Sequence, residues 1–144
     1  MSRSRDAEVR AAGNCRLAME GQIVDVPPPE GPEPNPGGSG PGGKHMRFAS
    51  RLVVLTDGGS CSANGARLQV EGADSVTILL TAATDYRLDP IGFDRSVDPS
   101  RVCRRILDGA SSRGYEDLRR RHVREHKSFF DRVELEIGDS PAPE

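Results

Sequence analysis

Apolar and polar side chains alternate along residues 46–59, which is the pattern of a β-strand with two unlike faces. Met46, Phe48 and Leu52 fall on one face, while Arg47 begins the other, whose later positions are also apolar. We therefore expect a strand that is half exposed at its start and buried on both sides further along.

Three more stretches predict strands before and after this one. Residues 15–26 predict two short strands, or one strand bent at Gly21. Asn64 and Gly65 stand between two alternating runs and predict a hairpin. Residues 73–87 predict a scaffold strand that is apolar on both faces and central in its sheet. Turn signals recur about every ten residues, so the four strands predict one layer of an antiparallel β-sandwich.

The second half of the chain changes to helical spacing. Asp98 and Pro99 predict a helix start, because an acidic N-cap precedes a proline at the first helical position. A second helix is predicted over Tyr115–Lys127, so residues 98–128 form a helical insertion. Residues 129–138 alternate again and predict a last strand that returns to the sheet. The expected fold is mainly β with two helices, a partial antiparallel β-sandwich.

Composition sets the limits of the folded region. Residues 1–14 are polar with little periodicity, and we expect them to be disordered. Residues 27–44 are almost all proline, glycine and polar residues, which predicts a flexible loop. Residues 139–144 have the composition of a tail or linker. The predicted domain is therefore 15–138, interrupted by that loop.

The charge of the chain does not indicate a polyanionic partner. The 144 residues carry a net charge of −2, and the basic run Arg119–Arg121 lies among acidic residues on a predicted helix. We therefore expect a solvated helix face and no nucleic-acid binding. No stretch is apolar enough to span a membrane. The N-terminal arginines precede no apolar segment, so the sequence predicts no signal peptide and leaves the compartment unknown.

Neither metal nor redox chemistry is indicated by spacing. Cys15, Cys61 and Cys103 lie far apart without a CxxC motif, which predicts free thiols and argues against a disulfide framework or a zinc site. His122 and His126 share a helix face, but no glutamate follows His122, so the zinc-protease pattern is not met. We expect these histidines to pack or to lie at the surface, and we predict neither a metal nor a cofactor.

An acid-rich segment contains Asp85, Asp89, Asp94 and Asp98, and two carboxylates can in principle perform acid–base chemistry. Their spacing does not match a calcium loop. A helix cap explains Asp98 and a turn at the following proline explains Asp89. The glycine-rich residues 37–43 lack the lysine of a phosphate-binding loop. We therefore predict no catalytic residue and no binding residue in this chain.

Two segments in this order carry a resemblance to a known family. They are GADSVTILLTAATDY and YEDLRRRHVREHKSFFDRVELEIG, with the Asp-Pro helix start between them. Over Arg16–Gly138 the chain resembles the N-terminal β-sandwich domain of glycoside hydrolase family 95, the α-L-fucosidase-like enzymes. The resemblance implies a sandwich of the super-sandwich type. It also implies that catalysis occurs elsewhere, in an (α/α)6 barrel that holds the carboxylic acid and the asparagine-assisted base of an inverting mechanism.

No position here matches the catalytic motifs of that family, so no catalytic residue is carried over. The resemblance implies that the intact enzyme hydrolyses terminal α-L-fucosyl linkages of a fucosylated glycan, with α-L-galactosyl linkages as the alternative. This chain would then be a non-catalytic fragment whose domain packs on a barrel that the chain itself lacks. The alternative is a freestanding carbohydrate-binding or adaptor module, which would need some of its few aromatic residues as a sugar platform.

Overall fold

The computed structural model of the chain describes residues 6–25, 43–135 and 138. They belong to two compact units, of which the first ends at Ser112 and the second begins at Arg113. The first unit contains the β-strands and one helix, and the second contains a single helix. This confirms the prediction of a mainly β chain with two helices, and the antiparallel pairing agrees with a partial sandwich.

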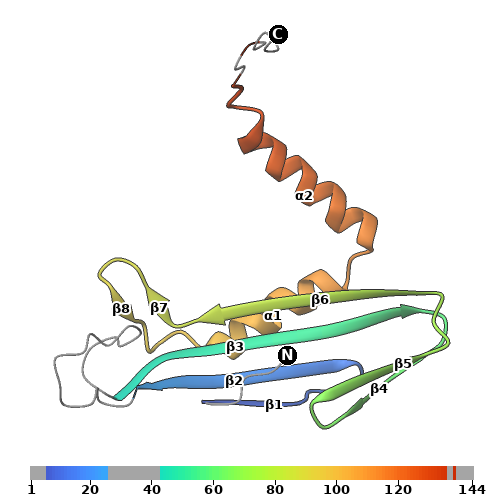
Figure 1. The fold of residues 1–144 in the computed structure, drawn as a ribbon, viewed down its shortest axis with the longest axis horizontal. Helices are drawn as coiled ribbons and strands as arrows, with labels where there is room; N and C mark the ends of the chain where they lie inside the picture. The colour runs from blue at the N-terminus through green and yellow to red at the C-terminus, as the bar shows by residue number, and fades with distance from the viewer. Residues whose placement is uncertain (1–5, 26–42, 136–137, 139–144) are drawn as a thin grey trace, which may run out of the picture. The chain divides into compact units, whose positions relative to one another are not determined.

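A four-stranded antiparallel sheet forms the base of the first unit (Figure 1). In spatial order its strands are β1 (Ala7–Ala11), β2 (Arg16–Asp25), β3 (Gly43–Asp57) and β6 (Ser75–Thr84). β3 contains most of the stretch that alternation predicted. β2 is one strand with a register shift between Gln22 and Val24, so of the two alternatives for residues 15–26 the single strand is correct.

β1 corrects the prediction that residues 1–14 are disordered. β1 pairs with β2 from Ala7 opposite Gly21 to Ala11 opposite Leu17. The sequence of β1 is AEVRA, and alanine, glutamate and arginine favour strands only weakly, so pairing with β2 overrides local preference. Residues 1–5, and the predicted flexible loop up to residue 42, lie outside the described residues, and the last two residues of that loop belong to β3.

β6 corrects a second prediction, because it is an edge strand and not a central one. Among the described residues β6 pairs only with β3, from Phe48 opposite Thr84 to Asp57 opposite Ser75. An apolar composition on both faces suggested burial between two neighbouring strands. In the structure one face of β6 contacts a helix and the other is exposed, as its alternating exposure shows.

The hairpin of β4 (Ser60–Asn64) and β5 (Arg67–Glu71) connects β3 to β6. Gly59 and Gly65 have φ of 65° and 57°, which confirms the turns that the sequence predicted. A Cβ at Gly59 would also collide with the carbonyl oxygen of Glu71, so this position requires glycine for space as well as conformation.

After β6 the chain forms a short ribbon of β7 (Tyr86–Arg87) and β8 (Gly92–Phe93), followed by α1 (Pro99–Ser111). Oδ1 of Asp98 accepts hydrogen bonds from the backbone N–H groups of Ser100 (2.9 Å) and Arg101 (3.2 Å), which confirms the predicted N-cap. α1 lies against one face of the sheet, where Cys103 and Leu107 are buried (Figure 1).

The second unit is dominated by α2 (Tyr115–Phe130), in which no residue is buried. α2 extends beyond the predicted Lys127, and the residues from 131 to 135 form a turn and irregular structure. The predicted return strand at 129–138 is therefore wrong for its described part up to residue 135. Local contacts favour the longer helix, because the rings of His126 and Phe130 stack one turn apart, with centroids separated by 5.3 Å.

Candidate functional site

A buried carboxylate lies where β6 ends, and we call Asp85, Arg47 and Arg95 the Asp85 cluster. Only 1% of Asp85 is exposed. Its Oδ1 accepts a hydrogen bond from the backbone N–H of Arg47 (2.8 Å), and its Oδ2 accepts from Arg47 Nε (2.8 Å) and Arg95 Nη1 (2.6 Å). The two guanidinium groups are partly exposed, so they satisfy a buried anion while remaining hydrated themselves.

These hydrogen bonds decide the charge state of Asp85. Burial by itself raises the pKa of Asp85, but the hydrogen bonds from the side chain and backbone of Arg47, and from Arg95, outweigh burial and lower the pKa below its ordinary value. A general acid needs a raised pKa, and a carboxylate nucleophile needs an accessible oxygen. Asp85 has neither property, so the cluster supports structure and not proton transfer.

The same arginines hold the segment between β6 and α1. Arg47 Nη2 donates to the carbonyl oxygens of Arg95 (2.8 Å) and Val97 (3.0 Å), and Arg95 Nη2 donates to that of His45 (3.0 Å). The Arg95 guanidinium also lies 4.8 Å from the ring centroid of Phe93. The Asp85 cluster thus ties the β7–β8 ribbon and the approach to α1 to the start of β3.

The other acids of this segment have local partners. Oδ1 of Asp94 accepts from the backbone N–H (3.0 Å) and the hydroxyl (2.6 Å) of Ser96, and these hydrogen bonds lower the pKa of Asp94. Asp89 lies in the turn before Pro90, as predicted. Asp94 approaches Asp85 through its backbone N–H, which donates to the Asp85 carbonyl (2.7 Å). The acid-rich segment therefore consists of turns and a cap.

Polar side chains also attach α1 to the sheet. Arg51 is buried, and its Nη2 donates to Glu20 Oε1 (2.9 Å) and to the hydroxyl of Ser100 (2.7 Å) at the start of α1. The Ser100 hydroxyl in turn donates to Glu20 Oε1 (2.6 Å). Further along the helix, Asp108 forms an ion pair with Arg16 (2.9 Å). These contacts fix the direction of α1 across β2 and β3.

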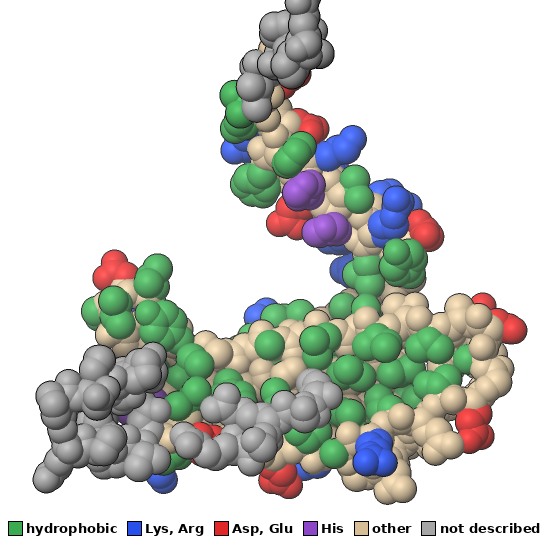
Figure 2. Space-filling model, in the orientation of Figure 1, with side chains coloured by type: hydrophobic (Ala, Val, Ile, Leu, Met, Phe, Trp, Pro, Cys, Tyr) green, Lys and Arg blue, Asp and Glu red, His purple; other side chains and the backbone are tan. Residues whose placement is uncertain are grey.

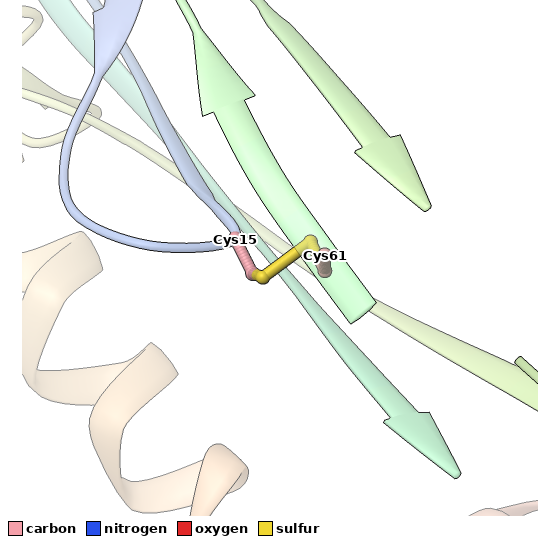
Figure 3. Close-up of a disulfide and its surroundings, with 2 residues drawn as sticks. All are labelled: Cys15 and Cys61. Atoms are coloured by element: carbon pink, nitrogen blue, oxygen red, sulfur yellow. A yellow bond between two sulfur atoms is a disulfide. The ribbon is translucent and has the colours of Figure 1, made fainter. Parts of the chain in front are cut away.

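Cys15 and Cys61 form a disulfide that joins the β1–β2 turn to β4 (Figure 3), so the prediction of free thiols is wrong for this pair. Their Cα atoms are 5.6 Å apart although 46 residues separate them in the sequence. Spacing gave no signal, because the sheet brings the two together. Cys103 is a free, buried thiol as predicted, 3.4 Å from the carbonyl oxygen of Ala49, and burial raises its pKa.

The histidine pair of α2 lies on one helix face as expected, with stacked rings whose centroids are 6.2 Å apart. Both His122 and His126 are exposed. Within the part of the chain that the structure describes, no three His, Cys, Asp or Glu side chains come together as a metal site would require. No described helix is long and apolar enough to cross a membrane.

The sheet face opposite α1 is the most unusual surface of the first unit, and we call it the uncharged face. Cross-strand pairing and alternation define its members, none of which carries a charge: Ala7, Val9, Ala11, Leu17, Met19, Gly21, Phe48, Ser50, Leu52, Val54, Thr56, Val76, Ile78, Leu80, Ala82 and Thr84. The opposite face, which contacts α1, includes Glu8, Arg10, Arg16, Glu20, Arg47, Arg51 and Asp57.

Exposure is uneven across the uncharged face. Leu17 and Val54 are buried, whereas on β6 Val76, Ile78 and Leu80 are 46%, 61% and 62% exposed. Figure 2 shows hydrophobic side chains gathered over the sheet in this unit. An exposed aliphatic patch on a face without charge is typical of a surface that contacts another protein surface. Alternation predicted the β3 part of this face, whereas the structure shows that the face continues onto β6 and that its β6 part is uncovered.

The described residues thus present a buried carboxylate that two arginines bind and a sheet face suited to packing. Together these features define a mainly β domain with an apolar packing surface. Residues 2–89 match the family model described as glycosyl hydrolase family 65, N-terminal domain, and the chain belongs to this family. The coarse prediction of a glycoside hydrolase N-terminal domain is thereby confirmed.

The chain is also similar to a plant protein named as a fucosidase. It is 33% identical over 104 residues to Alpha-L-fucosidase 2 of Arabidopsis thaliana, a match that covers 70% of this chain. The match covers 12% of the fucosidase, so the chain spans a small part of that relative's length.

Proposed function

We propose that this chain is a non-catalytic piece of the N-terminal β-domain of a family 95, α-L-fucosidase-like glycosidase. Its role would be to supply a sheet that packs against other parts of the intact enzyme, whose reaction would be hydrolysis of terminal α-L-fucosyl linkages. The similarity to a fucosidase supports the type of enzyme. The uncharged face is the observation that carries the structural role.

Physical chemistry favours packing over chemistry at this face. Burial of exposed aliphatic side chains such as Ile78 and Leu80 lowers the free energy by about 25 cal/mol per Å² of apolar area removed from water. They offer no group for acid–base or nucleophilic catalysis. The buried carboxylate of Asp85 is already bound by two arginines. The buried carboxylate is thus engaged, and the exposed aliphatic side chains of β6 are suited to burial.

A chimera tests this proposal. The chain would replace the 104-residue matching segment of Alpha-L-fucosidase 2. We expect the chimera to fold and to hydrolyse an aryl α-L-fucoside, and the separate chain to have no activity. Ile78→Lys in the chimera should sharply lower the yield of folded, active enzyme, because the substitution places a charge in a buried interface.

Ile106→Lys is the matched control. Ile106 lies on α1 and is 48% exposed, but it does not belong to the uncharged face. We expect this variant of the chimera to remain folded and active. Equal activity of the Ile78→Lys and Ile106→Lys chimeras would show that the uncharged face is not packed in the enzyme. Turnover by the separate chain that Asp85→Asn or Asp94→Asn abolishes would overturn the non-catalytic role.

A freestanding carbohydrate-binding module is the second candidate, and the exposure of Tyr86 favours it. Tyr86 is 47% exposed on β7, directly after Asp85 in the chain, and an exposed aromatic ring can stack on a sugar. If this reading is correct, the chain binds fucosylated oligosaccharides in calorimetry and Tyr86→Ala abolishes binding. No heat of binding would leave the packing role as the better proposal.

A further inference from the structure

The two edges of the four-stranded sheet differ in length and charge. β1 has five residues and carries Glu8 and Arg10, features that discourage pairing with another chain. β6 has ten residues, SVTILLTAAT, without charge, proline or glycine. It is the outermost strand on its side, and among the described residues it pairs only with β3 (Figure 1). Its free edge is therefore a template of backbone N–H and C=O groups for another strand.

We infer that β6 pairs antiparallel with β6 of a second copy of this chain, about a twofold axis at Leu79. Residues directly opposite each other in an antiparallel pair lie on the same face and contact each other. This register places Ile78 opposite Leu80, and Thr77 opposite Thr81, in both directions. Every opposing pair is uncharged. The pairs of Ile78 with Leu80 lie on the uncharged face, and Leu79 meets Leu79 of the second copy on the helix side.

The other edge explains why pairing stops at two copies. An isologous contact uses β6 of both copies, so among the described strands the two β1 edges form the ends of the joined sheet. These ends are short and charged, and they do not offer a further template. A contact between two single strands is smaller than a standard interface of about 1,600 Å², so we expect a weak dimer that depends on concentration.

This inference does not rest on the proposed function. In a longer glycosidase a strand of the same polypeptide would compete for this edge, because an intramolecular strand has the higher effective concentration. In solutions of this chain alone, the second copy is the partner that is present at high concentration.

Sedimentation velocity with charge-swap variants tests the pairing. One variant carries Ile78→Lys and Leu80→Lys, and the other carries Ile78→Glu and Leu80→Glu. Both positions are exposed, so the variants should fold as the parent does, which circular dichroism checks. We expect the parent to dimerise with rising concentration. Each variant alone should dimerise at least about tenfold more weakly, and a mixture of the two should regain dimers.

Amide hydrogen exchange by NMR distinguishes strand pairing from packing of one uncharged face on another. Edge pairing protects alternate amides of β6 as concentration rises and leaves β1 unchanged. We expect this pattern. A chain that stays monomeric at every concentration, or a dimer in which exchange of the β6 amides is unaltered, would overturn the inference.

Discussion

The two faces of the four-stranded sheet differ in what covers them. On the helix side, α1 buries Cys103 and Leu107, and Arg51, Glu20 and Ser100 add hydrogen bonds that fix its direction. On the uncharged face, Val76, Ile78 and Leu80 of β6 remain exposed, and their aliphatic side chains offer no hydrogen bond that could orient a partner. The chain thus fixes the position of α1 on the helix side by its own contacts. On the uncharged face, the position of a packing partner depends on the partner's own side chains.

The largest expected effect comes from shortening one leucine on each side of the sheet, Leu107 of α1 and Leu80 of β6. Leu107→Ala should lower the free energy of unfolding by about 3 kcal/mol, because Leu107 is 3% exposed and its truncation leaves a cavity. Leu80→Ala should change it by less than about 0.5 kcal/mol, because Leu80 is 62% exposed. Urea unfolding of both variants measures the difference. Similar losses for the two would mean that the uncharged face is already covered in this chain.

The next effect concerns the Asp85 cluster, which lies at the end of the sheet. Asp85→Asn should lower the free energy of unfolding by about 2 kcal/mol, because it weakens the charged hydrogen bonds from Arg47 and Arg95. Asp89→Asn, in the exposed turn of the same segment, is the control and should change stability little. Chemical unfolding at neutral pH makes the comparison, and an equal loss for the two would contradict a special role for the cluster.

Acid unfolding gives a second measurement of the same cluster. The pKa of Asp85 is lower in the folded than in the unfolded chain, so acidification adds protons to the unfolded state first. The stabilisation is present above the unfolded pKa and is lost as the pH falls through the folded pKa. Asp85→Asn should therefore flatten the decline of stability in acid. An unchanged acid profile would show that Asp85 is not the group responsible.

A smaller effect is expected at the start of α1, whose position defines the helix side of the comparison. Asp98→Ala should lower the free energy of unfolding by about 1 kcal/mol, because the N–H groups of Ser100 and Arg101 lose their acceptor. Asp98→Ser should restore most of that loss, since serine also caps helices. Thermal melts of the pair test the cap. If serine were no better than alanine, the charge of Asp98 would matter more than its hydrogen bonds.

Local signals explain which parts of the fold were predicted from sequence. Alternation predicted β3, glycine turns predicted the β4–β5 hairpin, and an N-cap predicted the start of α1. Each of these signals spans only a few neighbouring residues of the sequence. β1 has no strong signal of its own, and its strand conformation depends on β2. Alternation at 129–135 predicted a strand, but helical contacts extend α2 into this stretch.

Contacts between distant residues explain what the sequence did not show. The disulfide of Cys15 with Cys61, and the ion pairs of Asp85 with Arg47 and Arg95, depend on how the strands align. The edge position of β6 likewise depends on which strands the chain supplies to pair with it. The uncharged face could be assigned from alternation on β3 alone, but its exposure on β6 could not.

The smallest expected effect on stability is also the most direct test of the uncharged face. Ile78→Lys should change the thermal unfolding midpoint of the isolated chain little, because Ile78 is 61% exposed and a lysine there keeps its charge in water. The same substitution should raise solubility, since it interrupts an exposed aliphatic patch. Light scattering and thermal melts measure both, with Ile106→Lys on α1 as the matched variant. Suppose that Ile78→Lys lowers the free energy of unfolding by more than about 2 kcal/mol and Ile106→Lys does not. The isolated chain would then bury this face, and the two faces would differ only in which part of the chain covers them.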